Sequence, residues 1–142
     1  MTLTLRPHHV LCWLGYVGYG YSPEFIQEMG RIAALIRSGR VRTVILKSGF
    51  DNICRACPHH RGECRPEHLG PKGEKARDLD KAVLRALKLK QGHPYPLPEI
   101  KERIAALTAD QFNAVCVGCE WHSLGECLAG QQRLVKEIFP AP

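Results

Sequence analysis

The chain lacks the sequence features of several common enzyme classes. It has no glycine-rich phosphate loop and no strand–helix–strand alternation, the features that mark many nucleotide-binding proteins. It also has no Ser-His-Asp arrangement and no paired-carboxylate motif for acid–base catalysis. The sequence therefore names no reaction, and clues to function must come from the residue types that it concentrates.

Long hydrophobic runs are also missing. An apolar stretch over residues 10–21 follows Arg6, as the core of a signal sequence would, but glycines interrupt it and no small-residue cleavage site follows. The stretch is too short to span a membrane. We therefore expect a cytoplasmic protein with no membrane partner. In that reducing compartment, closely spaced cysteines act as ligands or redox groups more often than as disulfides.

The composition is that of an ordinary globular protein with a basic balance. The chain has 142 residues, 44% hydrophobic and 24% charged, and a formal net charge of +6. This length predicts one domain, over residues 1–142. The densest basic stretch, Lys72 to Lys90, alternates with Glu74, Asp78 and Asp80, which is typical of a solvated helix face. Nucleic acid is therefore a less favoured partner than a redox or other protein partner.

Hydrophobic periodicity and helix-start signals predict a small α+β fold that is mainly helical. We expect about five or six helices and one or two short strands, joined by Cys-rich loops that bind metal. The expected segments are a strand over 2–6, a helix over 8–16, a helix from Ser22-Pro23-Glu24 to 38–39, a strand over 41–46, a helix over 74–90 stopped by Gly92, an extended connector over 93–98, a helix over 98–107, a short helix capped by residues 108–111, and a helix from about 125 to Pro140.

Six of the seven cysteines fall in two nearly identical motifs. Residues 54–64 read CRACPHHRGEC, and residues 116–127 read CVGCEWHSLGEC. A Cys-x-x-Cys pair places two sulfurs at adjacent corners of a metal's coordination tetrahedron, and the later cysteine can close a third corner. Iron–sulfur clusters use the same pairs together with distal thiolates. Two matching triplets therefore predict a metal or cluster site, in preference to redox-active dithiols or buried structural cysteines.

Histidines and the seventh cysteine supply further candidate ligands. His60 and His122 hold matching places in the two motifs, either as fourth ligands or as hydrogen-bonding neighbours of the sulfurs. On a helix, Cys12 shares a face with His8, four residues before it, and lies close to His9, three before it. We expect Cys12 to complete a metal shell, with His8 and His9 as additional candidates. The six thiolate ligands predicted from the motifs are Cys54, Cys57, Cys64, Cys116, Cys119 and Cys127.

Ligand spacing does not decide between iron–sulfur and zinc. The first hypothesis is an iron–sulfur protein with a 4Fe–4S cluster, acting in electron transfer or redox sensing. The alternatives are a zinc-stabilised interaction module, with RNA among its candidate partners, and an enzyme that uses the metal as a Lewis acid. In the first hypothesis one cluster uses Cys54, Cys57, Cys64 and Cys12, and Cys116, Cys119 and Cys127 either hold a second site, with or without His122, or share the first.

Several of these segments together resemble a known family. LRPHHVLC at 5–12, GYSPEF at 20–25, DNICRACPH at 51–59 and CVGCEW at 116–121 resemble the prokaryotic family catalogued as domain of unknown function 1284. The resemblance extends over nearly the whole chain. It implies a small cytoplasmic iron–sulfur or metal-binding protein, and it implies that Cys12, His8 and His9 belong with the two cysteine motifs. It implies no substrate.

Overall fold

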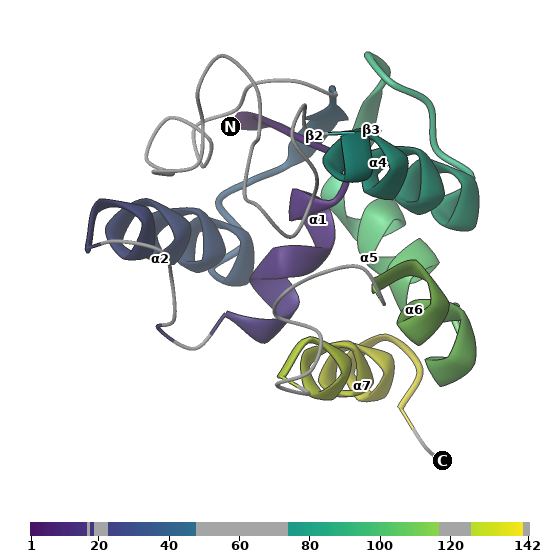
Figure 1. The fold of residues 1–142 in the computed structure, drawn as a ribbon. Coiled ribbons are helices and arrows are strands. Elements are labelled where there is room, and N and C mark those ends of the chain that lie inside the picture. Colours follow the sequence, from purple (N-terminus) through teal and green to yellow (C-terminus); the bar gives the residue numbers. More distant parts are fainter. Residues whose placement is uncertain (17, 19–22, 48–73, 117–125, 141–142) are drawn as a thin grey trace.

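The predicted α+β, mainly helical fold is confirmed. The structure is a computed structural model, and it describes residues 1–16, 18, 23–47, 74–116 and 126–140. Within those residues the chain forms six α-helices, a 3₁₀ turn (η1) and three strands (Figure 1). In chain order the elements are β1 (Thr2–Leu5), α1 (His9–Cys12), η1 (Trp13–Gly15), α2 (Pro23–Arg37), β2 (Thr43–Leu46), α4 (Glu74–Leu87), β3 (Pro94–Pro96), α5 (Leu97–Ala105), α6 (Ala109–Cys116) and α7 (Glu126–Ile138).

Buried and more exposed side chains alternate along two strands of the sheet. Leu3 and Leu5 of β1 and Val44 and Leu46 of β2 are buried, and the residues between them are more exposed. β1 and β2 run parallel, with Leu5 opposite Leu46, and β3 pairs antiparallel with the other edge of β2. The parallel pair is connected through α1 and α2, so the expectation of no strand–helix–strand unit was wrong for this part of the chain. One face of the sheet therefore packs into the core.

β3 is a strand where the sequence predicted only an extended connector. Its Tyr95 is buried, and the Tyr95 hydroxyl accepts a hydrogen bond from the backbone N–H of Lys90 at 3.0 Å. The flanking prolines, Pro94 and Pro96, fit an edge strand because they have no backbone N–H that could donate a hydrogen bond to another strand. The extended conformation was predicted correctly, but local periodicity does not report pairing with a distant strand.

α4 ends earlier than the position of Gly92 predicted. The last helical residue is Leu87, and Lys88 adopts a left-handed conformation with φ +57°. The N–H of Leu89 donates to the carbonyl of Leu84 at 3.0 Å, which closes the helix as a Schellman motif does. A lysine therefore occupies the position where glycine is usual.

Replacing Lys88 with glycine is expected to raise the free energy of unfolding by about 0.5–1 kcal/mol. The left-handed conformation costs a residue with a Cβ roughly 1–2 kcal/mol, and the extra freedom of glycine in the unfolded chain offsets part of that gain. Urea denaturation followed by circular dichroism measures the change. Lys81→Gly, at an exposed position inside α4, is the control and is expected to lose about 1 kcal/mol. Equal losses of stability in the two variants would contradict the left-handed conformation of Lys88.

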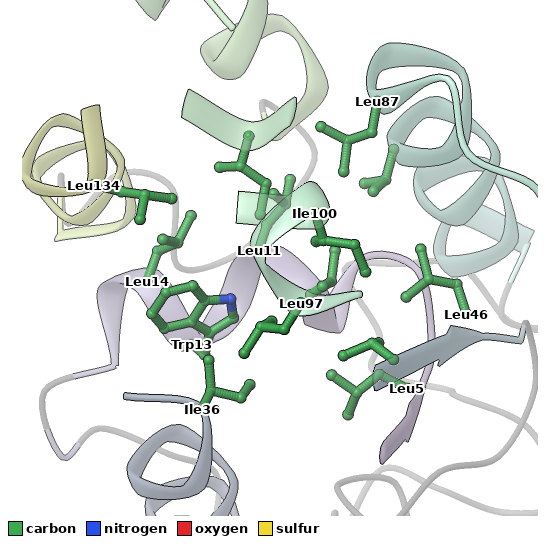
Figure 2. Packing of buried hydrophobic residues seen from close by; sticks show 14 of the residues in the cluster. Leu5, Leu11, Trp13, Leu14, Ile36, Leu46, Leu87, Leu97, Ile100 and Leu134 are labelled. Atoms are coloured by element: carbon green, nitrogen blue, oxygen red, sulfur yellow. The ribbon is translucent and has the colours of Figure 1, made fainter. Parts of the chain in front are cut away.

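The hydrophobic core surrounds the N-terminal helical segment. Figure 1 shows α1 and η1 (purple) running between α2 and the α4–α6 group, with α7 (yellow) against η1. Figure 2 shows that the buried side chains come from strands and helices alike. The apolar face predicted for α2 is confirmed at Met29, Ile32, Ala33 and Ile36. Among the described helices, none combines the length and apolar character needed to cross a membrane.

Two glycines allow α7 to lie directly on η1. A Cβ on Gly130 would overlap the backbone carbonyl group of Leu14. A Cβ on Gly15 would lie 2.6 Å from the Cα of Cys127 and 2.7 Å from its Sγ. The close approach of these two elements therefore fixes Cys127 beside the N-terminal segment.

Hydrogen bonds at helix ends hold α6 and α7 in place. The predicted capping box at the start of α6 is confirmed: the N–H of Thr108 donates to Gln111 Oε1 at 2.8 Å, and the N–H of Gln111 donates to Thr108 Oγ1 at 3.1 Å. Buried Gln131 of α7 donates from Nε2 to the carbonyls of Ile104 and Leu107 at 3.2 and 3.0 Å. The capping box fixes where α6 begins, and the Gln131 bonds join α7 to the end of α5 and the residues after it.

Candidate metal centre

A small cavity lies where the N-terminal segment meets α4, α6 and α7. Its volume is about 20 Å³, which is room for one water-sized occupant. Three cysteines and one histidine, contributed by three separate parts of the chain, face it together with apolar side chains. The lining residues are His8, Leu11, Cys12, Leu79, Val83, Cys116 and Cys127.

The local structure explains how each donor reaches the cavity. His8 immediately precedes α1 and Cys12 ends it, so the two lie one turn apart, as predicted, and the Cys12 thiol donates to the His8 carbonyl at 3.4 Å. Cys116 is the last residue of α6, and Cys127 is the second residue of α7. All three cysteines are thiols in the structure, with Cys116 buried and the other two partly buried. The fold therefore gathers sulfur donors that are far apart in the sequence.

Behind the cavity, a buried carboxylate joins α4 to the N-terminal segment. Asp80 Oδ2 accepts hydrogen bonds from Arg6 Nε and Nη2 at 3.1 and 2.8 Å. Asp80 Oδ1 accepts from the backbone N–H of His8 at 3.1 Å and lies 2.6 Å from His8 Nδ1. An ionised carboxylate beside a guanidinium only accepts hydrogen bonds, so Nδ1 of His8 carries the hydrogen and Nε2 carries the lone pair.

The environment keeps His8 neutral. Its pKa is lowered from 6.5 to about 4, mainly by burial and then by the neighbouring His9, with Arg6 adding a smaller effect. The hydrogen bond and the charge of Asp80 act in the opposite direction without overcoming burial. A neutral imidazole with one unprotonated nitrogen is the form that binds a metal.

Acidification is expected to destabilise the metal-free protein between pH 6.5 and pH 4. The unfolded chain protonates His8 near pH 6.5 and the folded protein only near pH 4, so the unfolded state binds more protons in this window. The free energy of unfolding therefore falls as the pH drops through it, by up to about 3 kcal/mol. Urea denaturation at several pH values measures this. In His8→Asn, the free energy of unfolding should change much less between pH 6.5 and pH 4. The same pH dependence in the variant and the wild type would contradict the expectation.

The predicted ligands divide into three groups. His8, Cys12, Cys116 and Cys127 line one cavity. His9 does not line it; its ring stands edge-on to that of His8, with the ring centroids 4.4 Å apart. The predictions for Cys54, Cys57, Cys64, Cys119, His60 and His122 fall outside the described residues.

Sequence reasoning missed Arg6 and Asp80. The interpretation of Asp80 as part of a solvated helix face was wrong, because its side chain is 1% exposed. Its position held the signal: Asp80 precedes the buried Val83 and Leu87 by three and seven residues, which places it on the apolar face of α4. The prediction was wrong because it treated a charged residue as exposed, although its spacing placed it on the apolar face. Nothing in the local sequence marks Arg6 as its partner.

The donors suit a metal by their chemistry, although the described side chains do not form a closed shell. Thiolates and imidazole are the ligands that zinc and iron centres prefer. Across residues 1–16, 18, 23–47, 74–116 and 126–140, no three His, Cys, Asp or Glu side chains are arranged closely enough to hold an ion as they stand. A centre at this cavity therefore requires the donors to draw together, or requires further ligands from the cysteine motifs.

Comparison with known proteins identifies a family but no activity. A family model described as "Protein of unknown function (DUF1284)" matches residues 20–125. That range contains the whole 54–64 motif and all of the 116–127 motif except its last two residues. Neither the curated proteins nor the solved structures yielded a match to the chain.

Proposed function

We propose that this chain, which belongs to the DUF1284 family, binds an iron–sulfur cluster of the 4Fe–4S type and acts in electron transfer or redox sensing. Cys12, Cys116 and Cys127 are the proposed thiolate ligands among the described residues. The observation that carries the proposal is that these three cysteines, from α1, α6 and α7, line one cavity.

The surroundings of these cysteines suit a buried redox centre. Leu11, Leu79 and Val83 supply apolar walls to the cavity. Burial, hydrogen bonds to sulfur and net charge are the properties through which a protein sets the reduction potential of a cluster. When bound, the cluster takes up and releases single electrons. The protein's own residues hold it in place, exclude solvent and set the charge around it.

Two observations favour a zinc-stabilised interaction module as a second candidate. The cavity of about 20 Å³ has room for one small occupant such as a single metal ion. In addition, a histidine supported by a carboxylate is a frequent arrangement at zinc sites. In this alternative the metal stabilises the fold and the protein acts by binding a partner.

Metal analysis of protein purified without oxygen tests both candidates. The untagged full-length chain is isolated anaerobically, and its iron, sulfide and zinc contents and its visible absorption are measured. A brown protein with bound iron and sulfide, bleached by dithionite, supports the cluster. A colourless protein with stoichiometric zinc supports the second candidate. A folded, colourless protein with neither metal would overturn the proposed function.

A further inference from the structure

We propose that His8 binds the metal centre through Nε2, and that Asp80 is the positioning residue that fixes the tautomer and orientation of its ring. The inference rests on the proposed metal centre and adds a nitrogen ligand and its carboxylate support to it. The ligand set at the cavity then becomes three sulfurs and one nitrogen. Asp80 itself does not line the cavity.

The contacts of Asp80 leave the His8 ring little freedom. One carboxylate oxygen faces both the backbone N–H and Nδ1 of His8, at 3.1 and 2.6 Å, so main chain and ring are held by the same atom. The other oxygen is bound by the Arg6 guanidinium, and the three residues are 1–8% exposed. With the hydrogen on Nδ1 directed at Asp80, Nε2 is the ring nitrogen left to act as a donor.

The geometry of α1 places His8 beside the residues that carry the sulfur donors. His8 and Cys12 lie one helical turn apart, and both line the cavity that Cys116 and Cys127 reach from α6 and α7. A metal-bound histidine commonly donates its other N–H to a carboxylate, which fixes the tautomer and makes the ligand more basic. The Asp80–His8 pair has that form.

A nitrogen ligand changes the charge of the centre. Imidazole is neutral and thiolate is negative, so three sulfurs and one nitrogen leave the centre one charge less negative than four sulfurs would. In iron–sulfur centres, replacing cysteine by histidine raises the reduction potential. For zinc, three sulfurs and one nitrogen are among the closed ligand sets of structural sites.

Nuclear magnetic resonance of histidine-labelled protein tests the ligand directly. The metal-free full-length chain carries ¹⁵N in its imidazoles and is titrated with ¹¹³Cd²⁺, a thiolate-binding probe that stands in for zinc. We expect His8 to be the Nδ1–H tautomer before addition and its Nε2 to show scalar coupling to cadmium afterwards. Bound cadmium without coupling to His8, or with coupling to Nδ1, would overturn the inference. A chain that binds no cadmium would contradict the proposed centre as well.

Three variants test the role of Asp80 by competition for Zn²⁺ with a chromogenic chelator. Asp80→Asn is expected to weaken affinity 10–100-fold, the usual effect of losing a ligand's supporting partner. His8→Asn keeps an N–H near the Nδ1 position but removes Nε2, and should weaken affinity at least as much. Asp78→Asn, exposed on the same helix, is the charge-matched control and should not change affinity.

The outcomes distinguish the role of His8 as a ligand from the role of Asp80 as a positioning residue. Unchanged affinity in His8→Asn would exclude His8 as a ligand. Weakened affinity in His8→Asn with unchanged affinity in Asp80→Asn would exclude the positioning role. A purely structural role of Asp80 would also leave the His8 tautomer unaltered in Asp80→Asn, whereas we expect a mixture of tautomers. If Asp80→Asn does not fold, the tautomer and cadmium coupling of the wild type decide the ligand, and the Nδ1–H tautomer is the remaining test of Asp80.

Discussion

Replacing Asp80 with alanine is expected to lower the free energy of unfolding of the metal-free protein by about 3–5 kcal/mol. The carboxylate is 1% exposed and is the acceptor for two hydrogen bonds from Arg6 and two from His8. Its removal takes the counter-charge from a buried guanidinium and the acceptor from two buried N–H groups. Breaking one side of a buried ion pair costs more than the pair contributes net, because the other charge stays desolvated.

The matched control for this variant is Asp78→Ala. Asp78 lies on the same helix, two residues away, and is exposed, so its replacement should change stability by no more than about 0.5 kcal/mol. Urea denaturation monitored by circular dichroism measures both variants. A double-mutant cycle with Arg6→Ala should give a coupling energy of about 1–3 kcal/mol. Equal small losses at positions 78 and 80, with no coupling to Arg6, would show that the buried network is not formed.

Replacing Gly130 with alanine is expected to lower the free energy of unfolding by about 3 kcal/mol. The added Cβ would overlap the backbone of Leu14, and backbone atoms cannot move aside as a flexible side chain can. α7 must therefore move away from η1, at a cost near the upper end of that for overpacked cores. Because α7 carries Cys127, the same movement should also reduce metal retention.

Gly30→Ala is the control for Gly130→Ala. Gly30 is also inside a helix, but a Cβ there would first meet the Tyr16 hydroxyl at 3.2 Å, the far end of a side chain. The higher helix propensity of alanine, worth about 1 kcal/mol, should offset that contact, so the control is expected to be nearly neutral. Thermal unfolding of both variants makes the comparison. A Gly130→Ala protein as stable as the wild type would mean that α7 and η1 do not pack as closely as the structure shows.

Local sequence signals predicted the elements that local physics controls. Apolar residues at helical spacing predicted the buried face of α2, and the Thr108–Gln111 pair predicted the start of α6. The four-residue spacing of His8 and Cys12 predicted that they would share a helix face, and both line the same cavity. In each case the interacting residues lie within about one helical turn of one another, so their relation is readable from spacing alone.

The parts that the sequence did not predict depend on contacts between distant segments. Asp80 is buried because Arg6, 74 positions earlier, balances its charge, and because Arg6 and His8 both donate hydrogen bonds to its oxygens. Lys88 ends α4 in a conformation unusual for lysine, where Arg103 of α5 donates to its carbonyl at 2.8 Å. Spacing placed Cys116 and Cys127 in one motif, but only the fold shows that Cys12 lines the same cavity as these two cysteines.

The measurement that tests the central claim most directly is the metal content of three single variants, Cys12→Ser, Cys116→Ser and Cys127→Ser, purified anaerobically beside the wild type. Circular dichroism of each variant establishes that it is folded. If the three cysteines ligate one centre, every variant should retain well under half of the wild-type metal, and the three losses should be similar. Folded variants that all keep the full wild-type complement would contradict the account, because the shared cavity would then hold no metal.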